Sequence, residues 1–406
     1  MTTKMRPFRE TIALDEARAR IDAVLRPIDR TERVPLSAAH GRVLAQDVVA
    51  AADVPPFARA AMDGYAVRAE DTSGASGEQP RVLKRIETLF TGQVAQRTIG
   101  PADCIEIATG APMPPGADAV VVVEHTDGEA SGAVRVYSPV STGQNIGPQG
   151  ADIHRGQQVL QVGMTLTPGR VGAMAALGLA EVTVYARPRV AILSTGNEIV
   201  EPGRPLGPGH IYDINRFTLA AVVAQHGGEP AAYRTVHDTT EDLSRALDAC
   251  LEEDLLVFSG GSSVGERDLI LDLLAARGEV IFHGIAVKPG KPTAFGTVAG
   301  KLFFGMPGYP TSCLSNAYIL LAPALRRMAR LPPQAAGSIA LPLSERIASA
   351  PGRHQVLTVR IVERTAVPAF KASGDITSMS QADGYIEIPA GTDVVEQGAI
   401  VEVRLF

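Results

Sequence analysis

The sequence of 406 residues contains no apolar run that approaches the roughly 18 residues needed for a membrane-spanning helix. Its first residues, MTTKMRPFRE, lack the apolar core of a signal peptide. Its net charge of −6 gives it no overall basic character of the kind that nucleic-acid-binding proteins show. These absences predict that neither a membrane nor a nucleic acid is a partner, and they favour a cytoplasmic location.

Cysteine is also scarce, with Cys104, Cys250 and Cys313 as its only occurrences. The spacing of these residues is too wide for a local zinc site, and their odd number argues against a disulfide framework. We therefore expect buried free thiols. The sequence has no HExxH pattern for zinc and neither of the glycine-rich phosphate-binding patterns, GxxxxGK[ST] and GxGxxG.

The pattern of the chain changes several times along its length. ETIALDEARARIDAVL, near the N-terminus, has helical periodicity, whereas residues 43–140 contain short β-branched runs between Gly and Pro turns and predict a mostly β module. From residue 187, apolar strands alternate with amphipathic helices, which predicts a parallel, doubly wound α/β sheet. EVIFHGIAV is predicted to be one strand, and residues 293–305 could form a hairpin. Thr239 and Asp242 resemble a capping box at the start of a helix. The segment after residue 333 predicts a small all-β domain.

Polar residues gather where the strands of the α/β segment end. In an open parallel sheet, ligands bind outside the carboxyl ends of the strands. Gly260 and Gly261 allow a tight turn with exposed N–H groups, and Ser262 and Ser263 add hydroxyl groups, so this loop could hold an anion. The other stretches expected at this edge are STGNE, His237–Asp238, KPGKP and MPGYPTS.

Carboxylates and lysines accompany the anion-binding loop. Glu198, Asp238 and Asp268 follow different strands, and Lys288 and Lys291 lie in a rigid Pro-Gly frame. Carboxylates beside a phosphate site usually hold a hard cation, most often Mg²⁺. The residues therefore predict a metal-bridged phosphate or nucleotide.

Simpler explanations exist for each stretch. GGSS could be an ordinary turn, Asp238 could merely begin a helix, and Glu198 could be a solvated loop residue. KPGKP could be a rigid surface turn, and Asp63–Gly64 could be a tight turn. The joint placement of these stretches carries more weight than any one of them.

Several ordered stretches resemble one known family. They are AMDGYAV, IATGAPMPPGADAVV, STGNEIV, SGGSSVGERD, VKPGKPTAFG, GMPGYPTS and TSMSQADGYIEIP. In this order they resemble the molybdopterin molybdenumtransferases, the family of MoeA and the gephyrin E domain. The resemblance implies an enzyme that takes adenylylated molybdopterin and molybdate, hydrolyses the adenylate with the help of Mg²⁺, releases AMP and forms molybdenum cofactor.

The resemblance also implies an architecture. It predicts a multidomain α/β plus β chain with a central doubly wound molybdopterin-binding domain and a C-terminal, small β-barrel-like domain. It implies a homodimer whose cleft is shared between subunits, with a molybdopterin adenylyltransferase as a possible delivery partner. The predicted domains are 1–50 with 147–186 (mixed α+β), 51–146 (β-rich, inserted), 187–330 (α/β) and 331–406 (C-terminal β).

Site residues follow from the resemblance by motif position. Glu198 and Asp268 become the metal ligands. The full catalytic set is Asp63, Thr109, Glu198, Asp238, Asp268, Lys288 and Lys291. The substrate-binding set is Asp152, Ser194, Gly196, Gly260, Gly261, Ser262, Ser263, Pro307, Gly308, Ser312 and Ser378.

This sequence departs from the family pattern at a few positions. Gly147 stands where Arg is usual, Ala151 where Glu is usual, and Tyr309 where Asn is usual. Ala60 replaces a Ser, and Thr358 stands where an Arg is expected, for which Arg353 or Arg360 could compensate. The departures keep two alternatives open, a diverged paralogue that acts on tungstate or another nucleotide-linked substrate, and a non-catalytic scaffold like gephyrin.

Overall fold

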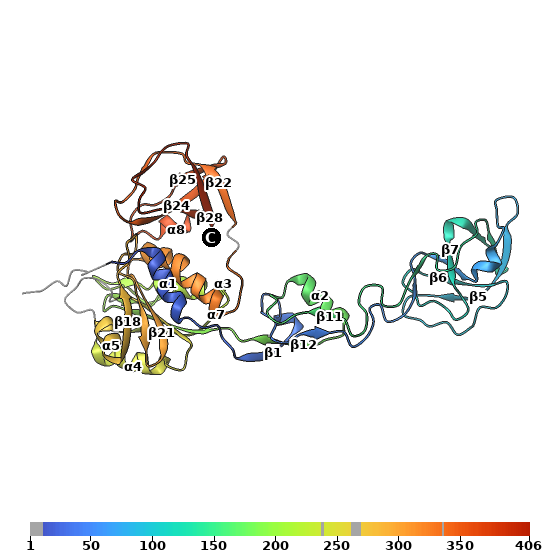
Figure 1. Cartoon of the computed structure of the whole chain (residues 1–406), viewed down its shortest axis with the longest axis horizontal. Coiled ribbons are helices and arrows are strands. Elements are labelled where there is room, and N and C mark those ends of the chain that lie inside the picture. The colour runs from blue at the N-terminus through green and yellow to red at the C-terminus, as the bar shows by residue number, and fades with distance from the viewer. Residues whose placement is uncertain (1–10, 237–238, 261–268, 335–336) are drawn as a thin grey trace, which may run out of the picture. The chain divides into compact units, whose positions relative to one another are not determined.

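The computed structural model describes residues 11–236, 239–260, 269–334 and 337–406 (Figure 1). The chain divides into two compact units. One contains residues 34–40 and 44–182, and the other contains the N-terminal residues to 33, residues 41–43 and residues 183–406. The boundaries between the units fall within β1 (Thr31–Pro35), on either side of residues 41–43, and within β12 (Glu181–Tyr185).

The first unit is rich in β-structure, as its sequence predicts. Its main sheet has the strand order β7-β4-β6-β5-β9-β8 and packs hydrophobic side chains on both faces. The strands are β4 (Gly64–Val67), β5 (Arg81–Leu89), β6 (Asp103–Ile107), β7 (Ala119–Val122), β8 (Thr126–Gly128) and β9 (Ala133–Val136). Gly64 must be glycine, because a Cβ atom there would lie 1.9 Å from the carbonyl oxygen of Val121.

Shorter elements complete this unit. Strand β2 (Val48–Val49) pairs with β11 (Gln158–Leu160), and β3 (Arg59–Ala60) pairs with β10 (Ile146–Gly147). Helix α2 (Pro168–Ala176) begins after Thr167, whose side chain accepts a hydrogen bond from the N–H of Arg170. Single 3₁₀ turns are η1 (Leu36–Ala38), η2 (Ala69–Thr72) and η3 (Val123–His125).

The second unit is built around a sheet with the strand order β16-β13-β17-β21-β20-β18. The strands are β13 (Arg189–Thr195), β16 (Glu229–Val236), β17 (Leu255–Ser259), β18 (Gly278–His283), β20 (Ala294–Val298) and β21 (Lys301–Met306). β16, β13, β17 and β21 run parallel, as predicted. β20 and β21 form the hairpin suggested by the sequence, so the sheet is mixed and its β18 edge is antiparallel.

The stretch EVIFHGIAV does not form one strand as the sequence predicts. Gly284 has a φ of +99° and interrupts it, so that β18 ends at His283. A separate strand, β19 (Val287–Lys288), then pairs with β24 (His354–Val362) in the C-terminal sheet. The predicted strand is therefore divided between two sheets.

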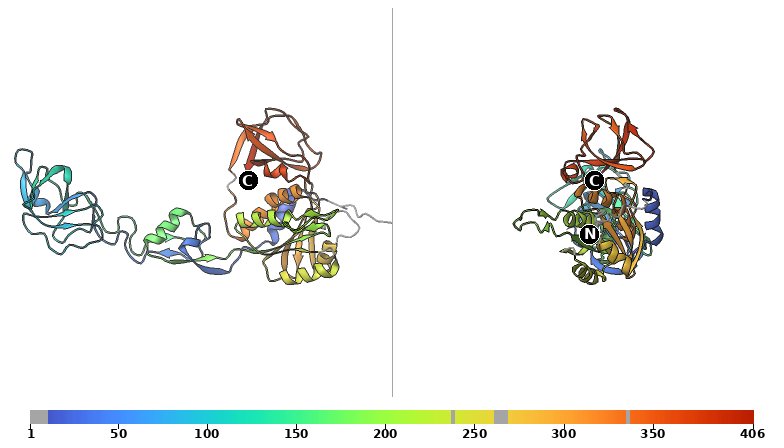
Figure 2. Two further views of the ribbon diagram at one scale, coloured as in Figure 1. Left: turned by 180° about the vertical axis from the view of Figure 1, so that it is seen from behind. Right: turned by 90° about the vertical axis from the view of Figure 1, so that its left-hand side faces the viewer.

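Helices cover both faces of the α/β sheet (Figure 2). One core joins the sheet to α1 (Leu14–Val24), α3 (Asn215–Gln225), α6 (Pro310–Asn316), the π-helical turn η4 (Ala317–Leu321) and α7 (Ala322–Met328). The other core joins it to α4 (Thr240–Cys250) and α5 (Leu269–Arg277). This arrangement is the predicted doubly wound layering. The hydroxyl oxygen of Thr239 accepts a hydrogen bond from the N–H of Asp242 at 3.2 Å and caps α4, as predicted.

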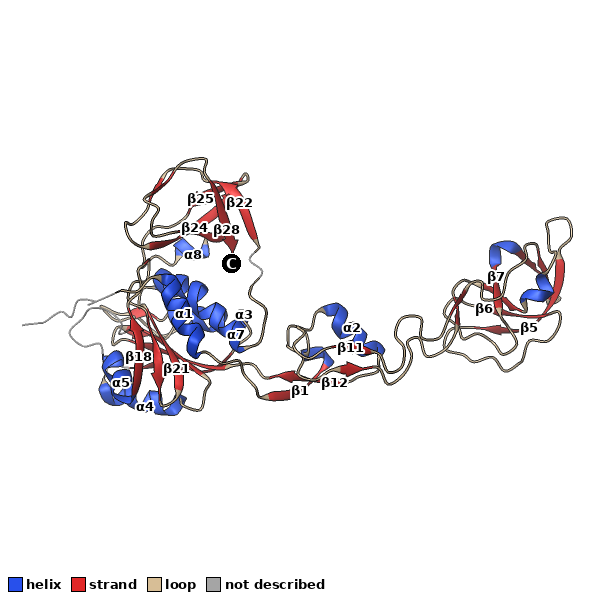
Figure 3. Ribbon diagram, viewed as in Figure 1, coloured by secondary structure: helices blue, strands red, loops and turns tan. Residues whose placement is uncertain are grey.

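The C-terminal segment forms a small β domain (Figure 3). Its main sheet has the order β19-β24-β26-β28-β22, with β25 paired to β24. The elements are β22 (Ser338–Pro342), β23 (Ile347–Ala348), β24 (His354–Val362), β25 (Thr365–Pro368), α8 (Thr377–Ser380), β26 (Gly384–Ile388), β27 (Val394–Val395) and β28 (Ile400–Leu405). Val356 and Tyr385 of this domain also belong to the core of the α/β sheet, so the two domains pack together.

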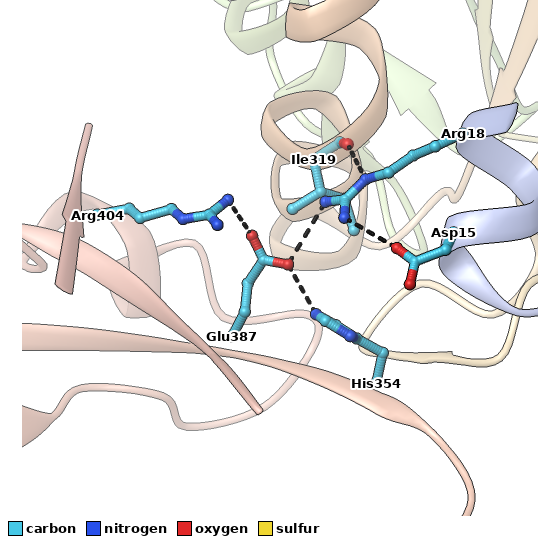
Figure 4. A network of polar contacts seen from close by, with 6 residues as sticks. All are labelled: Asp15, Arg18, Ile319, His354, Glu387 and Arg404. Atoms are coloured by element: carbon cyan, nitrogen blue, oxygen red, sulfur yellow. Dashed lines mark hydrogen bonds and ion pairs between the residues drawn. The ribbon is translucent and has the colours of Figure 1, made fainter. Parts of the chain in front are cut away.

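The same interface contains a charged cluster around Glu387 (Figure 4). Its carboxylate accepts hydrogen bonds from His354 at 2.8 Å and from Arg18 of α1 at 3.4 Å, and it also pairs with Arg404. Burial alone would raise the pKa of Glu387, but the hydrogen bond from His354 and the charges of Arg18 and Arg404 outweigh burial and lower it to about 2. The cluster therefore connects α1 to the C-terminal sheet through a carboxylate that stays ionised.

Replacing Glu387 should reveal how much its ionised carboxylate contributes to the stability of the fold. The wild-type carboxylate has a pKa of about 2 in the folded protein against 4.5 for the ordinary group, so its stabilisation is present above pH 4.5 and is lost as the pH falls toward 2. Glu387→Gln should lower the free energy of unfolding by about 3 kcal/mol at pH 7 and remove this loss at acid pH. Urea unfolding followed by tyrosine fluorescence at several pH values would measure both effects, and an unchanged pH dependence would contradict the assignment.

Candidate functional site

The strand order creates a switch point between β13 and β17, because β16 lies on one side of β13 and β17 lies on the other. Thr195 ends β13, and Gly260 follows β17. Gly260 has a φ of +100°, and a Cβ atom there would lie 2.2 Å from the carbonyl oxygen of Thr195. Only glycine fits this position, so the two strand ends come into close backbone contact where doubly wound proteins bind ligands.

Asn215, the first residue of α3, connects two of the loops at this edge. Its Nδ2 donates to the Ser259 hydroxyl at 2.7 Å and to the Gly308 carbonyl at 2.8 Å. A Cβ atom on Gly308 would lie 3.6 Å from the Cα of Gly260, so the two glycine backbones are neighbours. Asn215 thereby fixes the turn at residues 307–308 against the end of β17.

Asp213 is a buried carboxylate beside the end of β13. It accepts hydrogen bonds from the hydroxyl of Ser194 at 3.0 Å, from the hydroxyl of Thr235 at 2.9 Å and from the N–H of Arg216 at 3.1 Å. The guanidinium of Arg216 lies 3.6 Å from the same carboxylate. Asp213 therefore joins the ends of β13 and β16 to the start of α3. Ser194, a predicted substrate-binding residue, donates its hydroxyl proton to this carboxylate.

The STGNE loop places Glu198 next to its own backbone turn. Gly196 has a φ of +150°, and a Cβ atom there would lie 2.8 Å from each carboxylate oxygen of Glu198. Glu198 is exposed, and within the described residues no hydrogen bond or ion pair occupies its carboxylate. Its two oxygens are therefore available at the carboxyl end of β13, which suits a ligand for a hard cation.

A second buried asparagine supports the turn that carries the two lysines. The Nδ2 of Asn316, at the end of α6, donates to the Gly290 carbonyl at 2.7 Å and contacts the Thr293 hydroxyl oxygen at 2.5 Å. Gly290 has a φ of +103°, and its Cβ position is occupied by the Asn316 amide at 2.3 Å. Lys288 is exposed, Lys291 is half-buried, and both lie on this supported turn.

The C-terminal domain contributes the segment 371–378 to the same region. The N–H of Thr311 donates to the Ser373 carbonyl at 3.0 Å, and its hydroxyl donates to the Asp375 carbonyl at 2.9 Å. The buried Ser378 hydroxyl accepts from the N–H of Lys371 at 3.0 Å and closes this loop on itself. The predicted residues Pro307 and Ser312 are also buried here, before and within α6.

The other unit holds the remaining predicted residues that the structure describes. The N–H of Thr109 donates to a carboxylate oxygen of Asp63 at 2.7 Å, and hydrogen bonds from Thr109 lower the pKa of Asp63. Both residues are exposed, and so is Asp152. Asp63 is therefore an ionised carboxylate held in a fixed orientation by the Ala-Thr-Gly loop.

Other predicted residues lie outside the described part of the chain. They are Asp238, Gly261, Ser262, Ser263 and Asp268. Among the described residues, no group of three or more His, Cys, Asp and Glu side chains could hold a metal ion. The metal site of Glu198 and Asp268 thus remains a prediction.

The cysteines lie where the sequence predicts. Cys104, Cys250 and Cys313 are free and buried, and burial raises the pKa of both Cys104 and Cys313 to about 12. These thiols are packing residues. Within the described residues, no helix is long and apolar enough to cross a membrane.

Three residues of the site are absent from the sequence-based prediction: Asp213, Asn215 and Asn316. Asp213 and Asn215 precede or begin α3, where such residues are usually read as helix caps. Asn316 lies within an apolar helical pattern. Its amide is unusual in a core position, and this burial of a polar group is the signal that could have identified it.

Comparisons with known proteins bear on this geometry. A model of the MoeA N-terminal region (domain I and II) matches residues 12–178, a model of a probable molybdopterin binding domain matches residues 191–327, and a model of the MoeA C-terminal region (domain IV) matches residues 340–406. Molybdopterin molybdenumtransferase 2 of Mycobacterium tuberculosis H37Rv is 37% identical over 384 residues, which cover 92% of this chain and 94% of that protein. The chain belongs to the MoeA family of molybdopterin molybdenumtransferases.

Other MoeA proteins are similar to this chain in sequence and in structure. The molybdopterin molybdenumtransferase of Haemophilus influenzae is 36% identical over 318 residues, which cover 78% of each chain. A crystal structure of a molybdopterin biosynthesis MoeA protein from Pyrococcus horikoshii is 37% identical, covers 98% of this chain and 99% of its own, and superposes with a TM-score of 0.84. The predicted family, enzyme class and fold class are confirmed.

The departures from the MoeA pattern have distinct settings. Tyr309 is 67% exposed in the turn before α6 and lies 3.9 Å from the Cβ position of Gly374. Thr358 is buried in β24, and its hydroxyl has no partner within the described residues. Arg353 and Arg360 are both exposed. Because Thr358 points into the core, an arginine at this position would require a different local packing.

Removing the Asn215 amide should loosen the site without unfolding the protein. Asn215→Ala loses the bonds to Ser259 and Gly308, and a displacement of about 1 Å at reacting groups can cost up to 100-fold in rate. We expect kcat for molybdenum cofactor formation to fall by roughly 10- to 100-fold. Steady-state kinetics would measure this fall.

Asp254→Asn is a matched control. Asp254 immediately precedes β17, at the end of the strand opposite Ser259. Its carboxylate accepts hydrogen bonds from Arg30 at 2.6 and 2.8 Å and from the N–H of Arg189 at 2.8 Å. This change should lower stability by about 1–3 kcal/mol and leave kcat nearly unchanged. Equal losses of kcat in the two variants would show that Asn215 acts only through general stability.

Proposed function

We propose that this chain inserts molybdate into adenylylated molybdopterin, with Mg²⁺-dependent hydrolysis of the adenylate and release of AMP, to form molybdenum cofactor. The observation that carries the proposal is the close junction of Gly260 and Gly308, which the Asn215 amide holds together at the switch point. Such a junction leaves backbone groups facing the position where doubly wound domains bind phosphorylated ligands.

Charge complementarity supports binding of an anionic substrate. Lys288 and Lys291 lie on a turn whose shape is fixed by Asn316, so their positive charges are directed by a rigid backbone. Phosphate and molybdate are both tetrahedral oxyanions, and lysine ammonium groups and hydroxyl donors suit both. We assign these lysines and Ser312 to the oxyanion groups of the two substrates.

The residues present also fit a magnesium ion. Glu198 offers unoccupied carboxylate oxygens at the end of β13, and hard oxygen donors are what Mg²⁺ prefers. We assign Glu198 and Asp268 as the residues that would hold the ion. A bound Mg²⁺ would supply charge stabilisation at the phosphate oxygens.

The protein's own groups would orient the substrates. The Gly260 and Gly308 backbones would position the phosphate, the lysines would neutralise its charge, and Asp238 would contribute a further carboxylate. Asp63, held by Thr109, would act from the partner subunit of a homodimer. A molybdopterin adenylyltransferase would be the natural supplier, since it makes the adenylylated substrate.

A scaffold without activity is a weaker reading. Such a protein has no need to retain an exposed carboxylate at Glu198 and two lysines on one supported turn. Tyr309 instead favours a variation in substrate choice, because its exposed ring lies in the turn that precedes α6. Parallel assays with molybdate and tungstate would decide which oxyanion is used.

The proposal is tested by AMP release. The purified protein, incubated with Mg²⁺, molybdate and adenylylated molybdopterin, should release AMP and form molybdenum cofactor in equal amounts. Glu198→Gln should lower the rate by about 100-fold at limiting Mg²⁺, because it removes a charged ligand, and excess Mg²⁺ should partly restore it. Chromatography of AMP over a Mg²⁺ titration would measure both quantities.

Glu252→Gln serves as the control. Glu252 is an exposed glutamate that precedes β17, at the opposite edge of the sheet, and its loss should leave the Mg²⁺ dependence unchanged. Absence of AMP release by the wild-type protein would overturn the proposed reaction. Identical Mg²⁺ curves for Glu198→Gln and the wild type would overturn the metal assignment alone.

A further inference from the structure

A cavity lies away from the candidate site, between the helices of the α/β domain and the C-terminal sheet. Its volume is about 650 Å³, which is within the range of small-molecule sites. α1, η4, α7 and the segment after α7 form one wall, and β26 and β28 form the other. The lining residues with charged side chains are Arg18, Asp22, Arg326, Arg327, Arg330 and Arg404. None of the predicted catalytic or substrate-binding residues lines it.

Most of these arginines have a carboxylate partner. Arg18 and Arg404 approach Glu387 from opposite sides, as Figure 4 shows. Arg327 pairs with Asp22 at 2.5 Å, and Arg330 pairs with Asp29. These pairs hold the guanidinium groups in place around the cavity while leaving some of their N–H donors available, since each arginine has five.

Arg326 differs from the others. Its Nε donates to the Pro332 carbonyl at 2.8 Å, and within the described residues no carboxylate lies within ion-pair distance of it. Burial lowers its pKa, with no opposing charge to raise it. A partly buried guanidinium without a counter-ion is energetically costly, and an anionic ligand in the cavity would remove that cost.

The surroundings of Arg326 offer it no internal counter-ion either. The buried His226 has its pKa lowered to about 4 by burial and by the charge of Arg326, so it is neutral at physiological pH. The edge of its ring faces Tyr318 at 6.1 Å between centroids. Among the residues that the structure describes, the positive charge of Arg326 therefore has no carboxylate partner.

The rest of the lining is apolar or aromatic. The ring centroids of Tyr318 and Tyr385 lie 6.3 Å apart. Both rings pack against Phe406, with centroid distances of 4.8 Å for Tyr318 and 5.7 Å for Tyr385. Pro27, Pro323, Pro333, Ile319, Leu331 and Leu405 complete the apolar lining. A ligand that fills this cavity needs negative groups for the arginines and an apolar or planar body for the remaining surface.

We propose that this cavity binds a small organic polyanion, with two or more phosphate or carboxylate groups on a planar or apolar body, and that Arg326 is its principal charged contact. The guanidinium fork pairs equally well with either kind of group. Binding would bridge α1 and α7 to the C-terminal sheet and thereby strengthen the packing of the two domains. The cavity shares no lining residue with the site assigned to the transferase reaction.

Calorimetric titration of the full chain at low ionic strength tests the proposal. The probes are inorganic pyrophosphate and benzene-1,3,5-tricarboxylate, which separate phosphate from carboxylate recognition. We expect saturable one-to-one binding of at least one probe, weakened at least about tenfold in Arg326→Gln and weakened by added salt. Arg245→Gln, at an arginine that is 78% exposed on α4 and pairs with Asp242, should bind as the wild type does.

A double variant separates this cavity from the candidate site. Lys288→Gln with Lys291→Gln should retain the Arg326-dependent binding. Loss of binding in that variant, retention of it in Arg326→Gln, or no saturable binding of either probe to the wild type would each overturn the proposal.

A measurement on the unmodified sequence covers the case in which Arg326→Gln does not fold. Phenylglyoxal modifies accessible guanidinium groups, and mass spectrometry reports the extent at each arginine. The bound probe should protect Arg326 and leave Arg245 equally reactive. Equal modification of Arg326 with and without a saturating probe would overturn the proposal.

Discussion

The hydrogen bonds of one buried amide hold the candidate site together. Asn215 Nδ2 reaches both Ser259, at the end of a central strand, and Gly308, in the turn before α6. These two loops are 48 residues apart along the chain, from the separation of positions 260 and 308. A side chain at Gly260 would collide with the Thr195 carbonyl oxygen at 2.2 Å, so the close approach of this backbone to its neighbours requires glycine there. The amide and the two glycines thus form one constraint, and the positions of the backbone groups at the switch point depend on it.

Asn316 repeats this arrangement on the neighbouring turn. Its amide fills the space beside Gly290, where any Cβ atom would collide with it. In both places a helix carries a buried asparagine amide, and the amide donates a hydrogen bond to a carbonyl of a glycine-containing turn. Asn215 of α3 bonds to Gly308, and Asn316 of α6 bonds to Gly290. The hydrogen bonds from these helices thereby fix the conformation of loops whose local turn propensities alone would not fix it.

The sequence predicts the layers of the fold well because their signals are local. Apolar periodicity gives β13, β16, β17 and the helices between them, and the threonine before α4 is a cap that can be read directly. The division of EVIFHGIAV between two sheets was not predictable in this way. It depends on the pairing of Val287 and Lys288 with β24, which lies about 65 residues further along the chain.

The site was predictable in part for the same reason. Glu198 follows β13, Lys288 ends β19 and Lys291 lies in the turn after it, and all three stand out by residue type. The roles of Asp213, Asn215 and Asn316 come from contacts with residues far away in sequence. A carboxylate or amide near a helix end is already explained by a local role as a helix cap. Nothing in the sequence therefore points to an additional role in long-range contacts.

The strand β19 has a mechanical consequence. Lys288 pairs in register with Gln355 and so belongs to the C-terminal sheet. The carbonyl of Lys291 instead accepts hydrogen bonds from Ile285 and Thr293, and its turn is anchored to α6 through Asn316. Two lysines in one short turn are thus attached to two different bodies. A small rotation of the C-terminal domain would change the spacing of their charges, and with it the electrostatic potential at the proposed oxyanion site.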